Sequence, residues 1–156
     1  MKPYTNKISA VMLFFSVIFI LSSCTLPRRA DDSGNDNSIV GTARKYLGVS
    51  YKHGGSDPGG FDCSGFTMFV YKKNRIRIPR STNEQFTSGK KIKISEANPG
   101  DLVFFDINGK GISHVGIYTG NYRFIHSPRT GKTISYADLK NSYWKKRFRG
   151  IVTYTH

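Results

Sequence analysis

The sequence predicts a single α+β domain in which helices come before a run of strands. Helix-type apolar spacing and capping residues are concentrated before residue 89. From Pro99 onward, short β-branched and aromatic runs alternate with Gly- and Asn-containing turns. The chain has 156 residues, 38% of them hydrophobic and 13% aromatic, which is enough to build one core. Helices followed by strands in this order are typical of α+β folds.

Residues 1–23 have the pattern of an export signal. Lys2 and Lys7 precede a nearly unbroken apolar run over residues 8–21, which is too short for a comfortable membrane span. The run ends in Leu-Ser-Ser followed by Cys24, which resembles a bacterial lipobox. In that motif, cleavage precedes the cysteine and its thiol carries the lipid. The alternatives are an ordinary secretory signal and a plain transmembrane anchor.

Residues 24–37 would then form a lipidated cysteine and a flexible tether, because almost nothing apolar follows Leu26 in this polar stretch. Cys24 is followed by Thr25 and not by Asp. This resembles the outer-membrane sorting signal of enterobacteria, in which an Asp at this position marks retention in the inner membrane. We therefore expect a lipoprotein anchored in the outer membrane, facing the periplasm, with its folded domain over residues 38–156.

The first part of that domain should be helical. Ser38 can cap a helix that ends near Gly48. A Gly- and Pro-rich loop over residues 56–60 leads into a second helix that extends to residue 74. Ser81 and Glu84 have the spacing of a capping box, which predicts a third helix over residues 81–88.

The remainder should form an antiparallel sheet of about five or six strands. We expect an edge strand, a series of short strands with one helical turn near 137–144, and a last strand that closes the sheet. These strands are expected over residues 91–94, 102–106, 113–118, 122–127, 133–135 and 148–154.

Cys63 is a lone thiol in this scheme. If Cys24 carries lipid, no second cysteine remains to form a disulfide in an oxidising compartment. Asp62 and Ser64 both suit a helix start, so the sulfur would lie at the positive end of a helix dipole, which favours the nucleophilic thiolate. The alternative is an inert buried cysteine.

Two histidines flank a predicted hairpin. If the connection is the three-residue loop 119–121, Tyr118 opposes Tyr122, and counting outward, His114 directly opposes His126 on the same face. A two-residue turn would place the two imidazoles on opposite faces of the sheet.

This pair suits the chemistry of a thiol nucleophile. The thiol needs a base that later protonates the leaving group, and the base needs an orienting partner. The predicted order is Cys63, His114, His126. The alternatives are two ordinary half-buried histidines or a zinc site made by the three residues. No usual ligand spacing or nearby carboxylate pair supports zinc, so no metal or cofactor is expected.

The formal net charge of +14 predicts an acidic partner, and the alternative is a basic surface that is only solvated. Anionic lipid, cell-wall polymer and nucleic acid all carry suitable charge, but nucleic acid does not fit an exported lipoprotein. Two basic runs could attract such a partner: Lys72, Lys73, Arg75, Arg77 and Arg80, and separately Lys145, Lys146, Arg147 and Arg149.

Four sequence blocks together resemble the NlpC-type cell-wall cysteine peptidases. They are Asp-Cys-Ser-Gly-Phe over residues 62–66, Pro-Gly-Asp-Leu-Val-Phe-Phe over 99–105, Ser-His-Val-Gly-Ile-Tyr over 113–118 and Phe-Ile-His over 124–126. The resemblance covers roughly residues 38–154. The lipoprotein form is most similar to the small murein endopeptidases of Gram-negative bacteria.

The resemblance implies a papain-like core, with helices packed on the sheet and the nucleophile at a helix N-terminus. It implies hydrolysis of peptide bonds in peptidoglycan stem peptides or crosslinks, by a protein expected to be monomeric. Cys63 would be the nucleophile, His114 the general base and His126 its orienting partner. The alternatives are an amidase or acyltransferase on the same fold, or a wall-binding lipoprotein without catalysis.

Three more residues gain expected roles from the resemblance. The Tyr51 hydroxyl would lie near the thiol and stabilise the oxyanion with the Cys63 backbone N–H, unless Tyr51 is only a packing aromatic. Asp62 and Ser64 would shape the substrate cleft, although Asp62 could serve only as a helix cap. His53 stands where an aromatic is common and is expected to be a surface substitution, the alternative being a polar or titrating contact at the cleft edge.

Overall fold

A computed structural model of the chain describes residues 38–155. The expected export signal over 1–23, the lipidation site Cys24, the tether up to residue 37 and the terminal His156 lie outside the described residues. No helix among the described residues has the length and apolar character needed to cross a bilayer.

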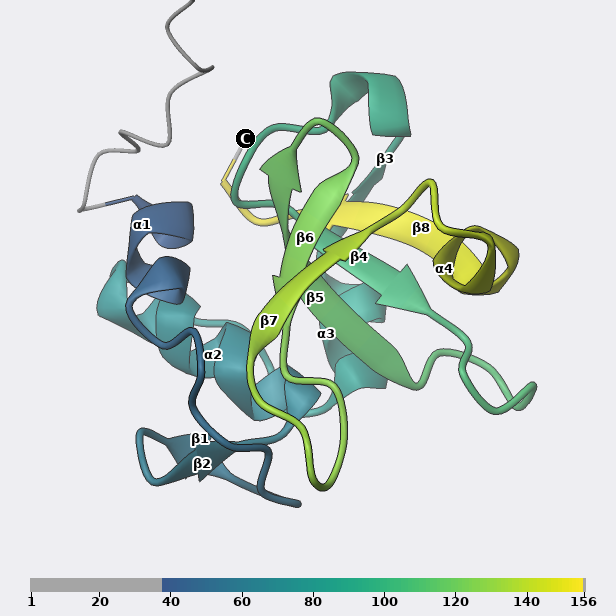
Figure 1. The fold of residues 1–156 in the computed structure, drawn as a ribbon. Helices are drawn as coiled ribbons and strands as arrows, with labels where there is room; N and C mark the ends of the chain where they lie inside the picture. The colour runs from purple at the N-terminus through teal and green to yellow at the C-terminus, as the bar shows by residue number, and fades with distance from the viewer. Residues whose placement is uncertain (1–37, 156) are drawn as a thin grey trace, which may run out of the picture. The chain divides into compact units, whose positions relative to one another are not determined.

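The centre of the domain is a six-stranded antiparallel sheet with the order β3-β8-β4-β5-β6-β7 (Figure 1). Its strands are β3 Lys90–Ile92, β4 Leu102–Phe105, β5 His114–Gly120, β6 Arg123–His126, β7 Ser135–Asp138 and β8 Phe148–Thr153. The prediction of an antiparallel sheet with five or six strands is confirmed.

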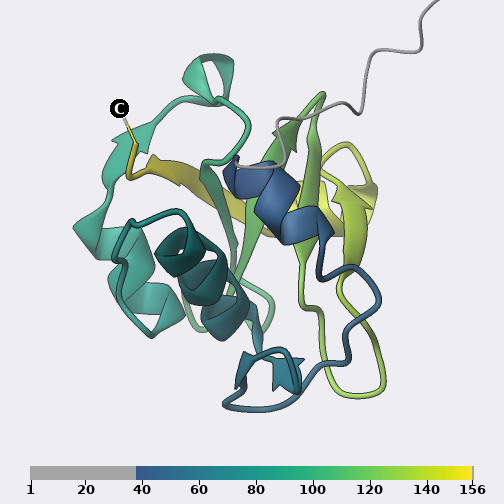
Figure 2. The ribbon, with the colours of Figure 1, turned by 90° about the vertical axis from the view of Figure 1, so that its left-hand side faces the viewer.

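Three helices cover one face of the sheet, and Figure 2 shows them side by side. They are α1 Ile39–Arg44, α2 Cys63–Lys73 and α3 Thr82–Ser88. Leu102 and Phe104 of β4 face these helices in the larger hydrophobic cluster. Ser38 caps α1, and the capping box between Ser81 and Glu84 is present at α3, as predicted.

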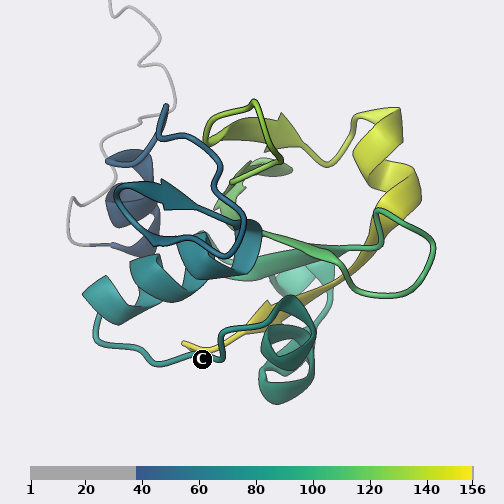
Figure 3. The same ribbon diagram turned by 90° about the horizontal axis from the view of Figure 1, so that it is seen from below.

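The other face carries a second cluster and the short helix α4 Ser142–Arg147, which lies across the sheet from α2 in Figure 3. Along β4, Leu102 and Phe104 belong to the first cluster, whereas Val103 and Phe105 belong to the second cluster on the α4 side. The central strands are therefore buried on both faces, which makes the domain a three-layer structure at this point.

Some predicted elements are corrected. The expected loop over 56–60 contains a small hairpin of β1 Ser56–Asp57 and β2 Gly60–Phe61, and residues Ile94–Glu96 form a 3-10 turn (η1) outside the edge strand. Strand β8 does not close the sheet but lies between β3 and β4. Its residues Ile151 and Val152 are buried there. Ala137 belongs to β7, and the helical turn begins only at Ser142.

The hairpin between β5 and β6 is also corrected. Tyr118 pairs with Phe124, not with Tyr122, and Gly120 pairs with Arg123. The connection is thus a two-residue turn in which Asn121 and Tyr122 both have positive φ, at 50° and 61°. Such backbone angles are those of the hairpin turn that best matches strand twist.

A two-residue turn alone would have separated the histidines, but the register shifts between Tyr118 and Gly120. Thr119 is an extra residue in a β-bulge there, and this bulge restores the parity that the shorter turn had changed. Continuing the register from Ile117 and Ile125 sets His126 against Gly116. His114 and His126 therefore share a face as predicted, but they are diagonal neighbours and the predicted direct opposition is wrong.

Candidate active site

Cys63 is the first residue of α2, and the backbone before it fixes its position. The Asp62 side chain caps the helix by accepting a hydrogen bond from the Gly65 N–H at 2.7 Å. Gly65 is required because a Cβ there would lie 2.1 Å from the Gly55 carbonyl oxygen. The Asp62 N–H donates to the same carbonyl at 3.0 Å, so the helix start rests directly on the Gly-Gly turn.

Asp62 and Ser64 are bound by one guanidinium. Arg80 donates to both carboxylate oxygens of Asp62, at 3.0 and 2.6 Å, and to Ser64 Oγ at 2.9 Å. Burial by itself would raise the pKa of Asp62, but the hydrogen bonds from Arg80 and Gly65 and the charge of Arg80 lower it overall. Sequence reasoning missed this role of Arg80, which it had placed in a basic surface run.

Cys63 is partly buried, and its thiol lies beside a hydroxyl. Its sulfur is 3.7 Å from Thr82 Oγ1, which comes from the start of α3. Burial raises the pKa of the thiol, while the Thr82 hydroxyl and the N–H groups of Val115 and Ser64 act in the opposite direction. The net pKa is raised, so the thiolate preference expected from the helix start is outweighed by burial in the resting protein.

His114 and His126 form a hydrogen-bonded pair. His114 Nε2 lies 2.8 Å from His126 Nδ1, and the two ring planes are nearly perpendicular. The side chains are 5% and 4% exposed. Because Nε2 of His114 is engaged with His126, Nδ1 of His114 is the nitrogen left to receive a proton. We assign the tautomer in which His114 donates from Nε2, since only this tautomer leaves Nδ1 as an acceptor.

Burial keeps both imidazoles neutral. It lowers the pKa of His114 to about 3, with a further contribution from His126. Burial alone lowers the pKa of His126 to about 4. The resting site at neutral pH therefore contains a thiol and a neutral imidazole that can accept its proton, and not a preformed ion pair.

Trp144 of α4 covers the two histidines and is a site residue that sequence reasoning missed. Its indole stacks on His114 with 5.6 Å between ring centroids, and it meets His126 edge-on at 4.9 Å. It also packs on Phe105 at 4.7 Å. As the single Trp of the sequence it was a visible signal, but nothing local indicated that it lies over β5 and β6.

Tyr51 lines the same cavity as Cys63. Its backbone forms a parallel bridge with Phe61, two residues before Cys63. Burial raises the pKa of the Tyr51 hydroxyl, and the charges of Cys63 and Asp62 raise it further, so the hydroxyl remains a donor at neutral pH. His53 is exposed, in agreement with a surface substitution.

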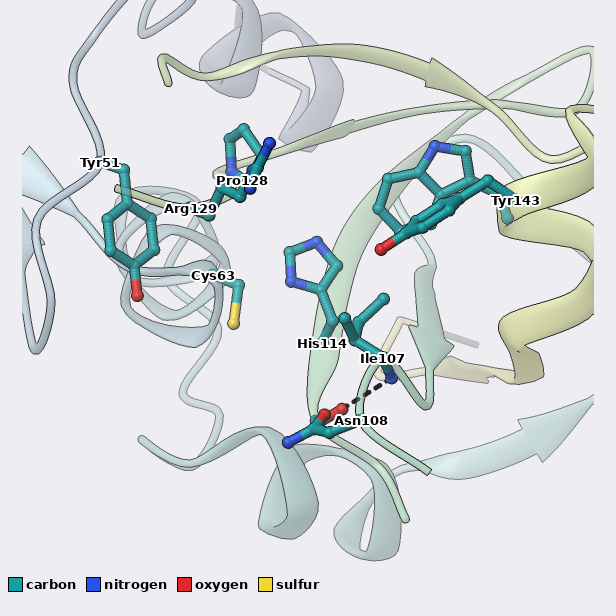
Figure 4. A pocket seen from close by; sticks show the side chains of 10 residues that line it. Tyr51, Cys63, Ile107, Asn108, His114, Pro128, Arg129 and Tyr143 are labelled. Atoms are coloured by element: carbon teal, nitrogen blue, oxygen red, sulfur yellow. Dashed lines mark hydrogen bonds between the residues drawn. The ribbon is translucent and has the colours of Figure 1, made fainter. Parts of the chain in front are cut away.

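The reactive groups meet in one cavity of about 620 Å³ (Figure 4). Its described lining is Tyr51, Cys63, Ile107, Asn108, Ser113, His114, Pro128, Arg129, Tyr143 and Trp144. Asp62 and Ser64, which were expected to shape the cleft, are not part of this lining; Asp62 caps α2 and Ser64 binds Arg80. Among the described residues, no group of three His, Cys, Asp or Glu side chains is arranged to hold a metal ion.

The sequence pattern of the NlpC/P60 family matches residues 48–153, which is most of the described domain. The chain belongs to the NlpC/P60 family. The match spans every block that carried the resemblance, and the α+β fold with a papain-like core agrees with it.

Individual NlpC/P60 relatives are similar over the same domain. The probable endopeptidase p60 of Listeria monocytogenes is 45% identical over 113 residues, which are 72% of this chain and 23% of p60. The murein DD-endopeptidase MepH of Escherichia coli is 46% identical over 109 residues, or 67% of this chain and 40% of MepH. This chain thus spans well under half the length of either relative.

A crystal structure of an NlpC/P60 family protein from Bacillus cereus has the same fold. Its TM-score is 0.72 at 33% sequence identity, over 78% of this chain and 40% of that chain.

Proposed function

We propose that this protein is a cysteine endopeptidase that hydrolyses peptide bonds in peptidoglycan stem peptides or crosslinks. One observation carries the proposal. Cys63 and His114 line the same cavity, and His126 binds Nε2 of His114, which leaves Nδ1 to accept the thiol proton. The relatives p60 and MepH, named as a probable endopeptidase and a murein DD-endopeptidase, support this proposal.

Acylation begins when the Cys63 sulfur attacks the carbonyl carbon of the scissile bond. The thiol proton moves to His114 Nδ1, and the His114 Nε2–H donates to His126, which stabilises the imidazolium that forms. The carbonyl oxygen becomes an oxyanion, for which the Cys63 backbone N–H at the start of α2 and the Tyr51 hydroxyl are the available donors. The C–N bond then breaks, and His114 returns the proton to the leaving amine.

Deacylation reverses these roles. Neutral His114 takes a proton from water as the water oxygen attacks the thioester carbon. The C–S bond then breaks to release the carboxylic acid, and His114 returns the proton to the Cys63 sulfur. Trp144 contributes by keeping both imidazoles buried and in place through the two steps.

The test is a digest of purified cell wall followed by mass spectrometry of the soluble muropeptides. We expect new free amino and carboxyl termini, whose position distinguishes the D-glutamyl–diaminopimelate bond from the D-alanyl–diaminopimelate crosslink. Cys63→Ala should give none of them. Equal products from this variant would refute the proposal, and transfer products in place of free acids would favour an acyltransferase.

We also propose that the protein is exported, lipidated at Cys24 and anchored as a monomer in the outer membrane, facing the periplasm. The Leu-Ser-Ser-Cys pattern after the apolar run over 8–21 and the Thr25 that follows support this proposal. Fractionation of cell membranes tests it, because Cys24→Ala should move the protein out of the membrane fraction. Retention of this variant in the outer membrane would contradict lipid anchoring.

A further inference from the structure

The catalytic cavity has an uneven charge. Among the ten described residues that line it, Arg129 is the only one with a permanent charge, because Cys63 and His114 are neutral at rest. No Asp or Glu is part of this lining. A substrate that fills the cavity therefore meets one guanidinium and no carboxylate.

The Arg129 guanidinium is available to a ligand. Asp62 and Asp106, the acidic residues in ion pairs near this end of the sheet, are bound by Arg80 and Arg149. Among the residues that the structure describes, Arg129 has no ion-pair partner, and its side chain is exposed. A planar fork of donors in this state matches a carboxylate in two parallel hydrogen bonds.

The loop that carries Arg129 is held by one side-chain and one backbone hydrogen bond to the segments that contain Phe61 and Tyr51. The Ser127 hydroxyl donates to the Phe61 carbonyl at 2.7 Å, and the Tyr51 N–H donates to the Lys132 carbonyl at 2.9 Å. Within the loop, the Lys132 N–H donates to the Arg129 carbonyl at 3.0 Å. The backbone that carries the Arg129 guanidinium is thus already ordered next to Tyr51. Less loop entropy is therefore lost when the guanidinium binds a ligand.

The cavity also has two unlike ends. Figure 4 shows Arg129 on one side of Cys63 and His114, and Asn108 on the other. A peptide that crosses the thiol would have one flank beside a cation and the other beside a neutral amide. Charge selection is consequently expected at the flank next to the β6–β7 loop.

We propose that Arg129 is a specificity-determining residue that binds a free carboxylate of the stem peptide. This inference rests on the proposed peptidase function and names the substrate class of the same site. Two carboxylates of the stem are candidates, one on D-glutamate and one on diaminopimelate, and both share the chemistry that a guanidinium recognises. Amidation of the bound carboxylate would remove its charge and one acceptor.

The test uses the full-length protein and three synthetic stem peptides: one with both carboxylates free, one amidated at D-glutamate and one amidated at diaminopimelate. We expect amidation at one of the two positions to lower kcat/KM about tenfold, as for a charge-assisted pair that is partly open to water. Arg129→Gln should abolish this discrimination, and Arg129→Lys should retain part of it. Lys132→Gln is the matched control in the same loop, outside the cavity lining, and should behave as the wild type.

Binding is measured separately so that the two proposals can fail independently. Calorimetry with the Cys63→Ala protein and the same peptides reports carboxylate selection without turnover. The inference is supported if Cys63→Ala binds the three peptides with different affinities and Cys63→Ala/Arg129→Gln does not. This holds even if the wild type cuts none of the peptides. Absence of cleavage would count only against the proposed peptidase function. Equal affinity for all three peptides, no binding at all, or unchanged discrimination without Arg129 would overturn the inference.

Discussion

The indole of Trp144 is stacked on the imidazole of His114, with 27° between the ring planes. The two residues come from different elements: α4 supplies the indole, and β5 supplies the imidazole that we propose as the general base. This contact gives α4 a direct connection to the chemistry, because the same indole also meets His126 edge-on.

Trp144→Ala should lower kcat/KM about tenfold by loosening the orientation of His114. It should also raise the pKa of His114 toward its ordinary value, because water would reach the ring. The measurement is the acid limb of the kcat/KM–pH profile, which reports the base of the free enzyme. Lys146→Ala, an exposed change on the same helix, is the control. A lower melting temperature with an unchanged pH profile would mean that Trp144 only packs.

His126→Asn should retain part of the activity, since the amide oxygen can still accept the His114 Nε2–H. We expect a loss of roughly 10- to 100-fold in kcat, against a loss of at least about 1,000-fold for His114→Gln, which removes the base. The comparison is made with the peptide that the wild type cuts best. If His126→Ala has the activity of the wild type, the hydrogen bond between His126 and His114 does not contribute to catalysis.

Arg80→Met should disturb the nucleophile's helix by leaving Asp62 without its partner. The Arg80 side chain is 40% exposed, so solvent screening limits the expected loss to about 1 kcal/mol of unfolding free energy. The pKa of Asp62 should rise at the same time, which carboxyl-carbon NMR can follow. Arg77→Met, on the same connector but exposed, provides the comparison. Identical Asp62 titrations in the two variants would contradict the assigned ion pair.

The buried histidines make the fold sensitive to acid. The pKa of His114 falls to about 3 and that of His126 to about 4, both below the ordinary value of about 6.5 in an unfolded chain. The unfolded chain therefore binds more protons in this range. The stabilising contribution of neutral burial is complete above about pH 6.5 and is lost as the pH falls toward 4 and 3.

Thermal melts between pH 7 and 4.5 check this, since most carboxylates still carry their charge there. We expect the melting temperature to fall with pH, and the slope to be smaller in His126→Asn. Exposed His53→Gln should keep the wild-type slope. A flat profile in the wild type would show that the two imidazoles are not the groups that take up protons.

Local signals were sufficient for most of the fold and for the position of Cys63 at the start of a helix. Ser38, the capping box at Ser81 and the glycine after Ser64 each act within a few residues, so the sequence shows them directly. The apolar run over residues 102–106 after a Pro-Gly turn likewise predicted a strand, but its burial on both faces was not predicted.

Errors and omissions arose where distant segments meet. The bulge at Thr119 leaves no clear local signature, so the hairpin register was wrong although the shared face of the histidines was right. Arg80 and Thr82 reach the start of α2 from a connector and a later helix, and Trp144 reaches β5 from beyond β7. These contacts depend on how the layers pack, which no short sequence window contains.

The bulge has a consequence for how the length of this hairpin can vary between relatives. Loss of Thr119 would leave Tyr118 opposite Phe124 and produce an ordinary ladder, with both imidazoles where they are now. Loss of a single residue nearer the site, such as Ile117, would turn His114 toward the helix-covered side and break its bond with His126. Alignment gaps in functional members should therefore collect at the tip and be absent from the arms.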